Sequence, residues 1–257
     1  MKNIPIIKYE HIRDMADSHS IRVKEFESQI AYLKKRGYEF LSLDEFSARK
    51  MQKEPLNEKC VLVIFEGGWR DFYENAYPIL KHFWAKAGVF IATEWIEESS
   101  IQALKEPNMA DSHLSHNEAI LALAQNPRSV VCTWEELRVC SGLISFGSMT
   151  HTYQLSNFVR KPWHEDAKLS KDLIAKNLKS NTAHLLWPRG QWDQNLLRTA
   201  KTLGFTSFYT AQNGTNFQGT SLEANNIITP TNSLFTLKKQ LFVYSSSLSL
   251  KLFRWLL

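Results

Sequence analysis

The sequence is poor in cysteine, glycine and proline. Its 257 residues contain three cysteines, Cys60, Cys132 and Cys140, without a Cys-x-x-Cys pair. An odd count with this spacing argues against a disulfide framework and against a structural zinc site. Ten glycines and eight prolines are few for a disordered chain, and 44% of the residues are hydrophobic. We therefore expect one globular domain, with Cys60 and Cys140 as core thiols.

A concentrated block of charge is also missing. The formal net charge is +5, but lysine and arginine are scattered apart from the run 34–36. This distribution does not predict a nucleic-acid surface. The first residues lead directly into an apolar stretch, without the charged, apolar and small-residue succession of a secretory signal. The sequence therefore predicts a cytoplasmic location.

The segment 241–257 is rich in leucine and aromatic residues, but Lys251 and Arg254 interrupt its apolar surface. It is too short and too charged for a comfortable membrane span. One interpretation is a terminal helix that packs on the rest of the domain. The alternative is an interfacial helix whose Phe253 and Trp255 enter the membrane surface, which would make the protein peripheral at the membrane.

The most informative stretch that is present runs from Val61 to Asp71. The apolar, β-branched residues 61–65 predict a buried strand. Glu66-Gly67-Gly68 follows at the point where a barrel strand would open onto a functional loop. A helix is expected to begin soon after Asp71.

This arrangement resembles the polysaccharide deacetylases, the NodB-homology proteins of carbohydrate esterase family four. Their first motif reads Thr-Phe-Asp-Asp-Gly at a strand end, where this chain has Ile64-Phe65-Glu66-Gly67-Gly68. Similar helices and strands follow in the family's order over roughly residues 4–217. The resemblance implies an α/β fold, a distorted (β/α) barrel of the NodB type over residues 1–240. A polar stretch at about 97–129 has no counterpart and is interpreted as an insertion.

The resemblance also implies which residues stand at the family's metal site. In the family the first motif supplies a general base and a ligand to a divalent metal such as zinc, and two histidines of a second motif complete the site. Glu66 stands at the base position, whereas Gly67, Met149 and Tyr153 stand at the ligand positions. Glycine has no ligand atom, and a thioether or a neutral phenol is a poor ligand for such an ion. The sequence therefore predicts no metal and no other cofactor.

Histidines offer two alternative sites. His151 lies between Met149 and Tyr153 and could form a two-ligand site with Glu66, although the family does not use that offset. The segment 111–116 carries two histidines three residues apart, which is a possible ligand spacing on a helix and is also common by chance. Its other interpretation is a helical insertion with solvated histidines.

The family's third motif, an aromatic-Pro-aromatic-Gly stretch, aligns with residues 186–193. Arg189 replaces an aromatic residue there. Since a guanidinium pairs well with a carboxylate, we hypothesise an ion pair between Glu66 and Arg189. The alternative is that Arg189 points to solvent.

Two functions remain open. The first is a surface-glycan protein without the metal-dependent reaction, a pseudoenzyme that binds an N-acetylated glycan or a polysaccharide-biosynthesis enzyme; the loss of metal ligands favours it. The second is an active carbohydrate N-deacetylase in which Glu66 alone activates water. Tryptophans could stack on a sugar or simply pack in the core. The candidate substrate-binding residues are His11, Trp69, His151, Trp187, Arg189 and Trp192.

Overall fold

A parallel sheet forms the centre of the computed structural model, which describes residues 3–15, 17–52, 58–105, 114–153 and 161–244. Eight strands belong to this sheet, and two short ones pair separately. The large sheet contains β1 (Ile6–Tyr9), β4 (Tyr38–Phe40), β5 (Lys59–Gly67), β6 (Ala87–Ile91), β7 (Ile144–Ser148), β8 (His184–Leu186), β9 (Ser207–Asn213) and β10 (Asn225–Ile227). The small pair is β2 (His11–Ile12) with β3 (Ser20–Ile21).

The sheet curves into a nearly closed barrel. Its order is β1-β5-β6-β7-β8-β9-β10, with β4 beside β5. Backbone hydrogen bonds join the two ends, because the N–H of Lys8 donates to the Ile228 carbonyl at 2.9 Å and the N–H of Ile228 donates to Ile6 at 2.7 Å. The predicted α/β barrel is thereby confirmed.

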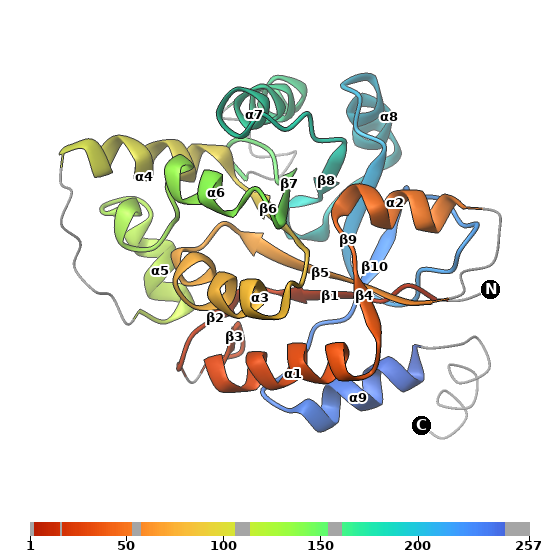
Figure 1. Cartoon of the computed structure of the whole chain (residues 1–257). Helices are drawn as coiled ribbons and strands as arrows, with labels where there is room; N and C mark the ends of the chain where they lie inside the picture. Colours follow the sequence, from red (N-terminus) through yellow and green to blue (C-terminus); the bar gives the residue numbers. More distant parts are fainter. Residues whose placement is uncertain (1–2, 16, 53–57, 106–113, 154–160, 245–257) are drawn as a thin grey trace.

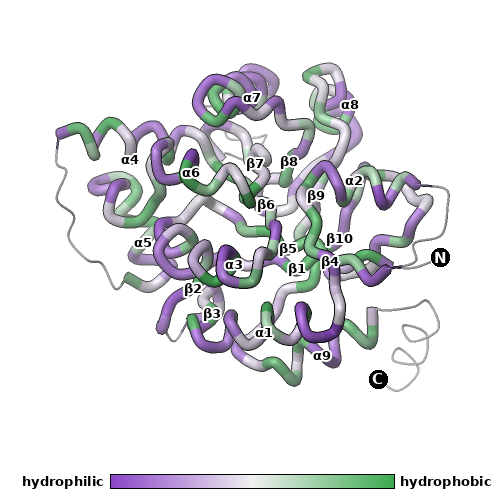
Figure 2. The backbone as a smooth tube through the Cα atoms, viewed as in Figure 1, coloured by the Kyte–Doolittle hydropathy of each residue, from purple (hydrophilic) through white to green (hydrophobic). Residues whose placement is uncertain are grey.

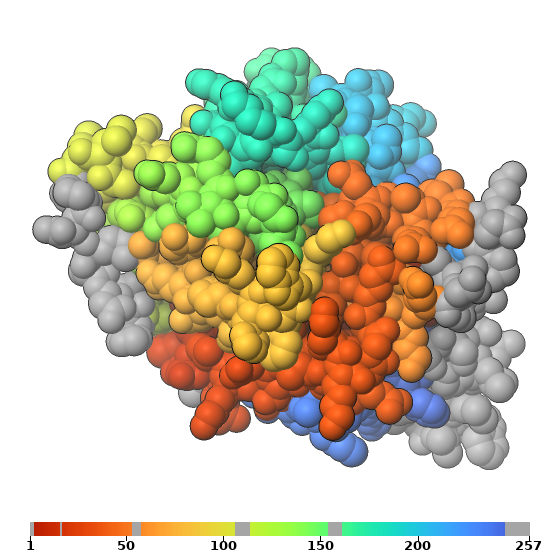
Figure 3. Space-filling model, in the orientation of Figure 1, coloured from red at the N-terminus to blue at the C-terminus, as the bar shows by residue number. Residues whose placement is uncertain are grey.

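Helices surround the barrel (Figure 1). The first and last described helices, α1 and α9, contact each other and lie side by side in Figures 1 and 3. The helical elements are α1 (Val23–Lys35), α2 (Leu43–Met51), the π-helical turn η1 (Phe72–Ala76), α3 (Tyr77–Phe83), α4 (Thr93–Lys105), α5 (His116–Ala122), η2 (Pro127–Ser129), α6 (Trp134–Cys140), α7 (Trp163–Leu178), η3 (Pro188–Gly190), α8 (Gln194–Thr202) and α9 (Leu234–Val243).

Strand alternation divides the apolar side chains into two layers. Successive residues of a strand point to opposite faces. In β5, Leu62 and Ile64 belong to the cluster inside the barrel, whereas Val63 and Phe65 pack between sheet and helices. In Figure 2, hydrophobic residues are frequent along the strands, whereas the helices alternate between hydrophilic and hydrophobic residues. The same alternation directs Lys8 and Glu66, the next residues of the inward series in β1 and β5, into the mouth of the barrel.

Within the stretch 97–129, the described residues form most of α4 and all of α5, which agrees with the helical interpretation for these parts; residues 106–113 lie outside the described residues. Ser115 and Glu118 form a reciprocal capping box at the start of α5, which explains why the helix begins there. Residues 245–257 lie outside the described residues, so their two interpretations, and the cytoplasmic location, stay predictions. No helix in the described part of the chain combines the length and apolar character that a bilayer crossing needs.

Candidate functional site

A pocket of about 360 Å³ opens at the carboxyl ends of β1 and β5. In barrels of parallel strands this end carries the functional loops. The volume lies within the range of small-molecule sites, about 300–1,000 Å³. Most of its lining residues are aromatic or ionisable, and Gly67, Ile120 and Met149 complete the wall: Lys8, Glu10, His19, Glu66, Gly67, Trp69, Trp95, His116, Ile120, Met149, Tyr153 and Arg189.

Lys8, Glu66, Met149 and Tyr153 form what we call the Glu66 cluster. The Lys8 ammonium is ion-paired with Oε2 of Glu66, and the Tyr153 hydroxyl donates to Oε1 at 3.0 Å. Burial alone would lower the pKa of Lys8, but the attraction of Glu66 outweighs it and raises that pKa. Burial and the same carboxylate raise the pKa of Tyr153. Lys8 is therefore a cation and Tyr153 a neutral phenol, and each oxygen of Glu66 accepts one bond from the protein.

The residues at the family's metal positions do not fit a divalent cation. Gly67 has a φ of +101°, and a Cβ added there would lie 2.5 Å from Nε1 of Trp69. Its N–H donates to the sulfur of Met149 at 3.2 Å. The indole of Trp69 thus fills the space that a side chain at position 67 would enter. Met149 and Tyr153 are hydrogen-bonded within the protein, to Gly67 and Glu66 respectively.

The predicted ion pair between Glu66 and Arg189 is wrong. The cationic partner of Glu66 is Lys8, because β1 and β5 are neighbouring strands and both side chains point into the barrel mouth. Arg189 does line the pocket, from η3, with a left-handed φ of 52°. It therefore remains available to a ligand, but it does not neutralise Glu66.

The structure places His151 outside the pocket lining of the described residues. Its ring Nδ1 lies 2.9 Å from the Thr93 hydroxyl, and its backbone N–H donates to Asp166 at 3.2 Å. The imidazole is buried. This placement argues against the predicted substrate contact and against a two-ligand site with Glu66.

Two of the predicted stacking residues pack against each other. Trp187 is only 1% exposed and stacks on Trp192, with ring centroids 5.9 Å apart, and on Phe208 at 5.5 Å. Neither tryptophan lines the pocket among the described residues. The packing interpretation therefore describes Trp187 and Trp192 better than the sugar-stacking one.

Two other tryptophans do form the pocket wall. Trp69, one of the predicted residues, is 2% exposed, and its indole N–H has no acceptor among the described residues. Trp95 of α4 was missed by sequence reasoning; it is half-buried and packs against Trp69 and Tyr153. No motif pointed to it, because α4 reaches the pocket only through the tertiary structure.

A second group of ionisable side chains, which we call the histidine cluster, consists of Glu10, His11, His19 and His116. His116 Nδ1 lies 3.1 Å from His11 Nε2 and 3.5 Å from Glu10 Oε1. His19 stacks on His116 with centroids 4.0 Å apart, and its Nδ1 lies 2.7 Å from Glu10 Oε2. Glu10, His19 and His116 line the pocket, whereas the predicted residue His11 is fully buried behind them.

The prediction of solvated histidines in the insertion is wrong for His116. Its side chain is 16% exposed, and burial lowers its pKa, with neighbouring His19 and His11 adding to the effect and Glu10 opposing it. The α5 helix turns this residue inward, towards β1. Residues 111–113 of that segment, which include its other histidine, His113, lie outside the described residues.

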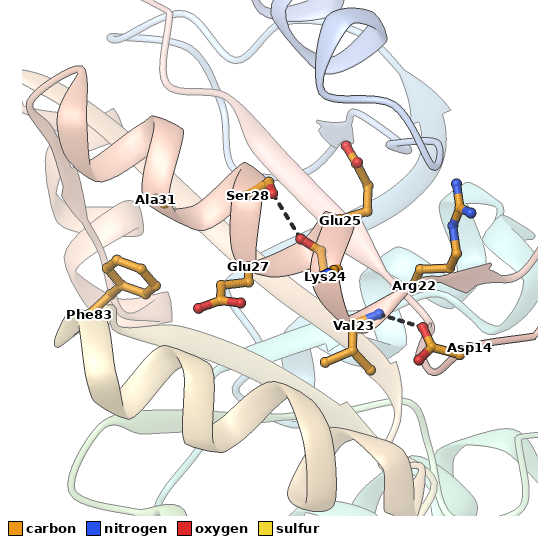
Figure 4. Close-up of a pocket in the computed structure, with 9 residues that line it drawn as sticks. All are labelled: Asp14, Arg22, Val23, Lys24, Glu25, Glu27, Ser28, Ala31 and Phe83. Carbon is orange, nitrogen blue, oxygen red and sulfur yellow. Dashed lines mark hydrogen bonds between the residues drawn. The ribbon is translucent and has the colours of Figure 1, made fainter.

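A larger hollow, about 1010 Å³, lies along α1 (Figure 4). Its charged side chains, among them Arg22, Lys24, Glu25 and Glu27, are of mixed sign. Figure 4 draws two hydrogen bonds, and each joins a side chain to a backbone group. The Val23 N–H donates to the Asp14 carboxylate, and the Ser28 hydroxyl donates to the Lys24 carbonyl. This hollow lacks the coupled ionisable groups of the smaller pocket, which is therefore the candidate site.

Comparisons with known proteins agree with this architecture. Residues 53–208 match the family described as polysaccharide deacetylase. YxkH of Bacillus subtilis is 25% identical over 213 residues, 82% of this chain and 65% of YxkH. The poly-beta-1,6-N-acetyl-D-glucosamine N-deacetylase of Staphylococcus aureus is 28% identical over 200 residues, 73% of this chain and 59% of that protein. The chain thus spans less than two thirds of the length of these relatives.

Among solved structures, the Streptococcus pyogenes deacetylase PplD in complex with acetate superposes with a TM-score of 0.76 at 24% identity, over 93% of this chain and 97% of that chain. IcaB from Ammonifex degensii superposes with a TM-score of 0.72 at 19% identity, over 93% of this chain and 97% of its own. Both likenesses concern the fold.

Proposed function

Because the chain belongs to the polysaccharide deacetylase family, with residues 53–208 matching it, we propose that it binds an N-acetylated glycan in the barrel-mouth pocket without carrying out the family's metal-dependent deacetylation. Relatives named as poly-beta-1,6-N-acetyl-D-glucosamine N-deacetylases support N-acetylglucosamine polymers as the ligand class. The proposal concerns a pocket for a sugar rather than a reaction on it.

The observation that carries this proposal is the state of Glu66. A general base needs a free lone pair within reach of the proton that it removes. Here the Lys8 ammonium and the Tyr153 hydroxyl each bond to one oxygen of that carboxylate, so an attacking water would have to share these oxygens with two protein donors. The residues at the family's ligand positions add to this, because Gly67 has no ligand atom and Met149 and Tyr153 bond to Gly67 and Glu66.

The remaining wall is suited to a sugar. Trp95 and Tyr153 supply aromatic surface, and Arg189, which is exposed, adds a cationic donor. Pockets with apolar walls and a few fixed polar groups are typical of small-ligand sites. Arg189 could donate to the carbonyl oxygen of an acetamido group.

Titration calorimetry with a short β-1,6-linked N-acetylglucosamine oligomer tests the proposal, together with a measurement of released acetate. We expect saturable binding and no acetate release beyond the background rate. Trp95→Ala should weaken binding roughly tenfold, since a central aromatic anchor often contributes more than 1 kcal/mol. Trp84→Ala is the matched control, because Trp84 is 80% exposed and outside the pocket lining.

Failure to bind the oligomer at millimolar concentration would overturn the glycan-binding proposal. Acetate release that disappears in Glu66→Gln would overturn the non-catalytic part and favour the active N-deacetylase. Equal binding by Trp95→Ala and Trp84→Ala would place the sugar elsewhere.

A further inference from the structure

We infer that Glu10, His11 and His116 form a divalent-metal site of the zinc class on the pocket wall, at positions other than the Glu66 cluster. The inference goes beyond glycan binding and does not depend on it. Imidazole nitrogen and carboxylate oxygen are the ligands that zinc takes in sites with three protein ligands.

The ligand atoms already lie at suitable distances from one another. Ligands about 2.0–2.1 Å from a tetrahedral zinc ion are about 3.3 Å apart. His116 Nδ1 lies 3.1 Å from His11 Nε2 and 3.5 Å from Glu10 Oε1, values on either side of that distance. All three atoms lie within 4.8 Å of one another. An ion could therefore be accommodated by small movements of side chains.

A carboxylate behind the cluster orients one ligand. Oδ2 of Asp71 lies 2.6 Å from Nδ1 of His11, and a proton on Nδ1 that bonds to this carboxylate would leave the Nε2 lone pair directed towards His116. Asp71 also accepts from the Ile12 N–H at 3.1 Å, which holds the carboxylate in place. Metal-bound histidines commonly have such a partner on the other ring nitrogen, and it raises their basicity.

The second carboxylate, Glu10, is held as well. Its Oε2 is occupied by His19 at 2.7 Å, which leaves Oε1 directed at His116. Glu10 and His116 line the pocket while His11 is buried, so a bound ion would keep its fourth position on the pocket side. Three protein ligands and one open position are typical of zinc sites that bind an exogenous ligand.

The local charge favours a cation. Glu10, Asp71 and Asp17 surround the cluster, since Asp17 accepts from the His116 N–H at 3.2 Å. Arg13 is the cation that pairs with both aspartates, and Lys8 is neutralised by Glu66. Three negative charges therefore face one positive charge, and a divalent ion would balance the remainder.

A bound ion would also connect distant parts of the chain. His116 begins α5, whereas Glu10 and His11 adjoin β1 and β2, more than 100 residues earlier. The metal would thus fix α5 against the barrel mouth and define one side of the sugar pocket. This effect gives a readout that is independent of any enzymatic activity.

Zinc titration of the whole chain, after dialysis against a chelator, tests the site. Wild type should bind one equivalent of Zn²⁺, and its melting temperature should rise on zinc addition. Loss of a partner behind a ligand costs about 10–100-fold in affinity, so loss of a ligand in His116→Gln or Glu10→Gln should cost at least about 100-fold. The zinc affinity of Asp71→Asn should lie between that of these variants and that of wild type.

His164→Ala is the matched control, because it removes a histidine whose side chain is 60% exposed and distant from the cluster in the chain. It should bind zinc as wild type does. Equal zinc affinity in wild type, His116→Gln and Glu10→Gln would overturn the inference, as would the absence of a stoichiometric site in wild type. Zinc-dependent acetate release that requires His116 would support the site while contradicting the non-catalytic function.

Discussion

The Glu66 cluster and the histidine cluster lie on one pocket wall, but they differ in whether a cationic side chain pairs with their carboxylate. In the Glu66 cluster the carboxylate is satisfied within the protein by Lys8 and Tyr153. In the histidine cluster the carboxylate of Glu10 and two imidazoles converge without a cationic side chain between them among the described residues. The comparison indicates that a protein can retain a pocket while changing which of its groups is available to a ligand.

The largest expected effect concerns Gly67, which lies beside the Glu66 cluster. The indole of Trp69 fills the space that a side chain at this position would need. Gly67→Ala should cost about 3 kcal/mol of unfolding free energy, because strain at positive φ and overpacking against the indole add together. Gly37→Ala is the control: its φ is +74° and nothing lies within 4 Å of the added Cβ. It should cost about 1 kcal/mol. Urea unfolding measures both, and equal losses would show that Trp69 moves aside freely.

The second prediction breaks the ion pair. Lys8→Met leaves the Glu66 carboxylate part-buried without its cation and should cost about 2 kcal/mol in urea unfolding. Replacing both partners removes the unpaired charge, so Lys8→Met with Glu66→Gln should recover at least half of that loss. Additive losses in the double variant would mean that the two side chains are not coupled.

The two clusters also differ in how far the sequence predicts them. Glu66 could be placed at a strand end because the run 61–65 is apolar and the glycines follow at once. The sequence analysis does not find its pairing with Lys8, although the alternation of Ile4, just before β1, with Ile6 and Lys8 in β1 carries the signal once a closed barrel is assumed. Residue type alone favours Arg189 of the third motif as the partner, whereas strand geometry favours Lys8.

The histidine cluster could not be predicted from local patterns. His11 and His116 are 105 residues apart, and their contact depends on how α5 packs against the barrel mouth. The segment around His116 has no match to a metal motif, and its helical spacing pointed to a partner at position 113 rather than to β2. Likewise, the burial of Trp187 follows from its stacking on Phe208, a residue of β9.

A smaller effect is expected at Tyr153, the third member of the Glu66 cluster. Tyr153→Phe removes one hydrogen bond to a carboxylate and should cost about 1 kcal/mol. The same change in a Glu66→Gln background should cost less, since the acceptor is then neutral. Urea unfolding of the four proteins measures this coupling, and identical losses in both backgrounds would contradict the bond to Glu66.

The smallest effect is a predicted lack of pH dependence. The pKa of Lys8 is raised above its usual value of 10.5 in the folded protein. Its stabilising contribution is therefore fully present below that pH and is lost only as the pH rises through the folded-state pKa. The difference in unfolding free energy between wild type and Lys8→Met should stay constant from about pH 7 to about pH 9. A decrease over this range would mean that burial, rather than Glu66, controls Lys8.

Anomalous X-ray diffraction at the zinc absorption edge, from crystals soaked in Zn²⁺, tests the contrast between the two clusters most directly. We predict a peak between Glu10, His11 and His116, with the pair of Lys8 and Glu66 intact. A peak on Glu66 and Tyr153, with Lys8 displaced, would contradict the account.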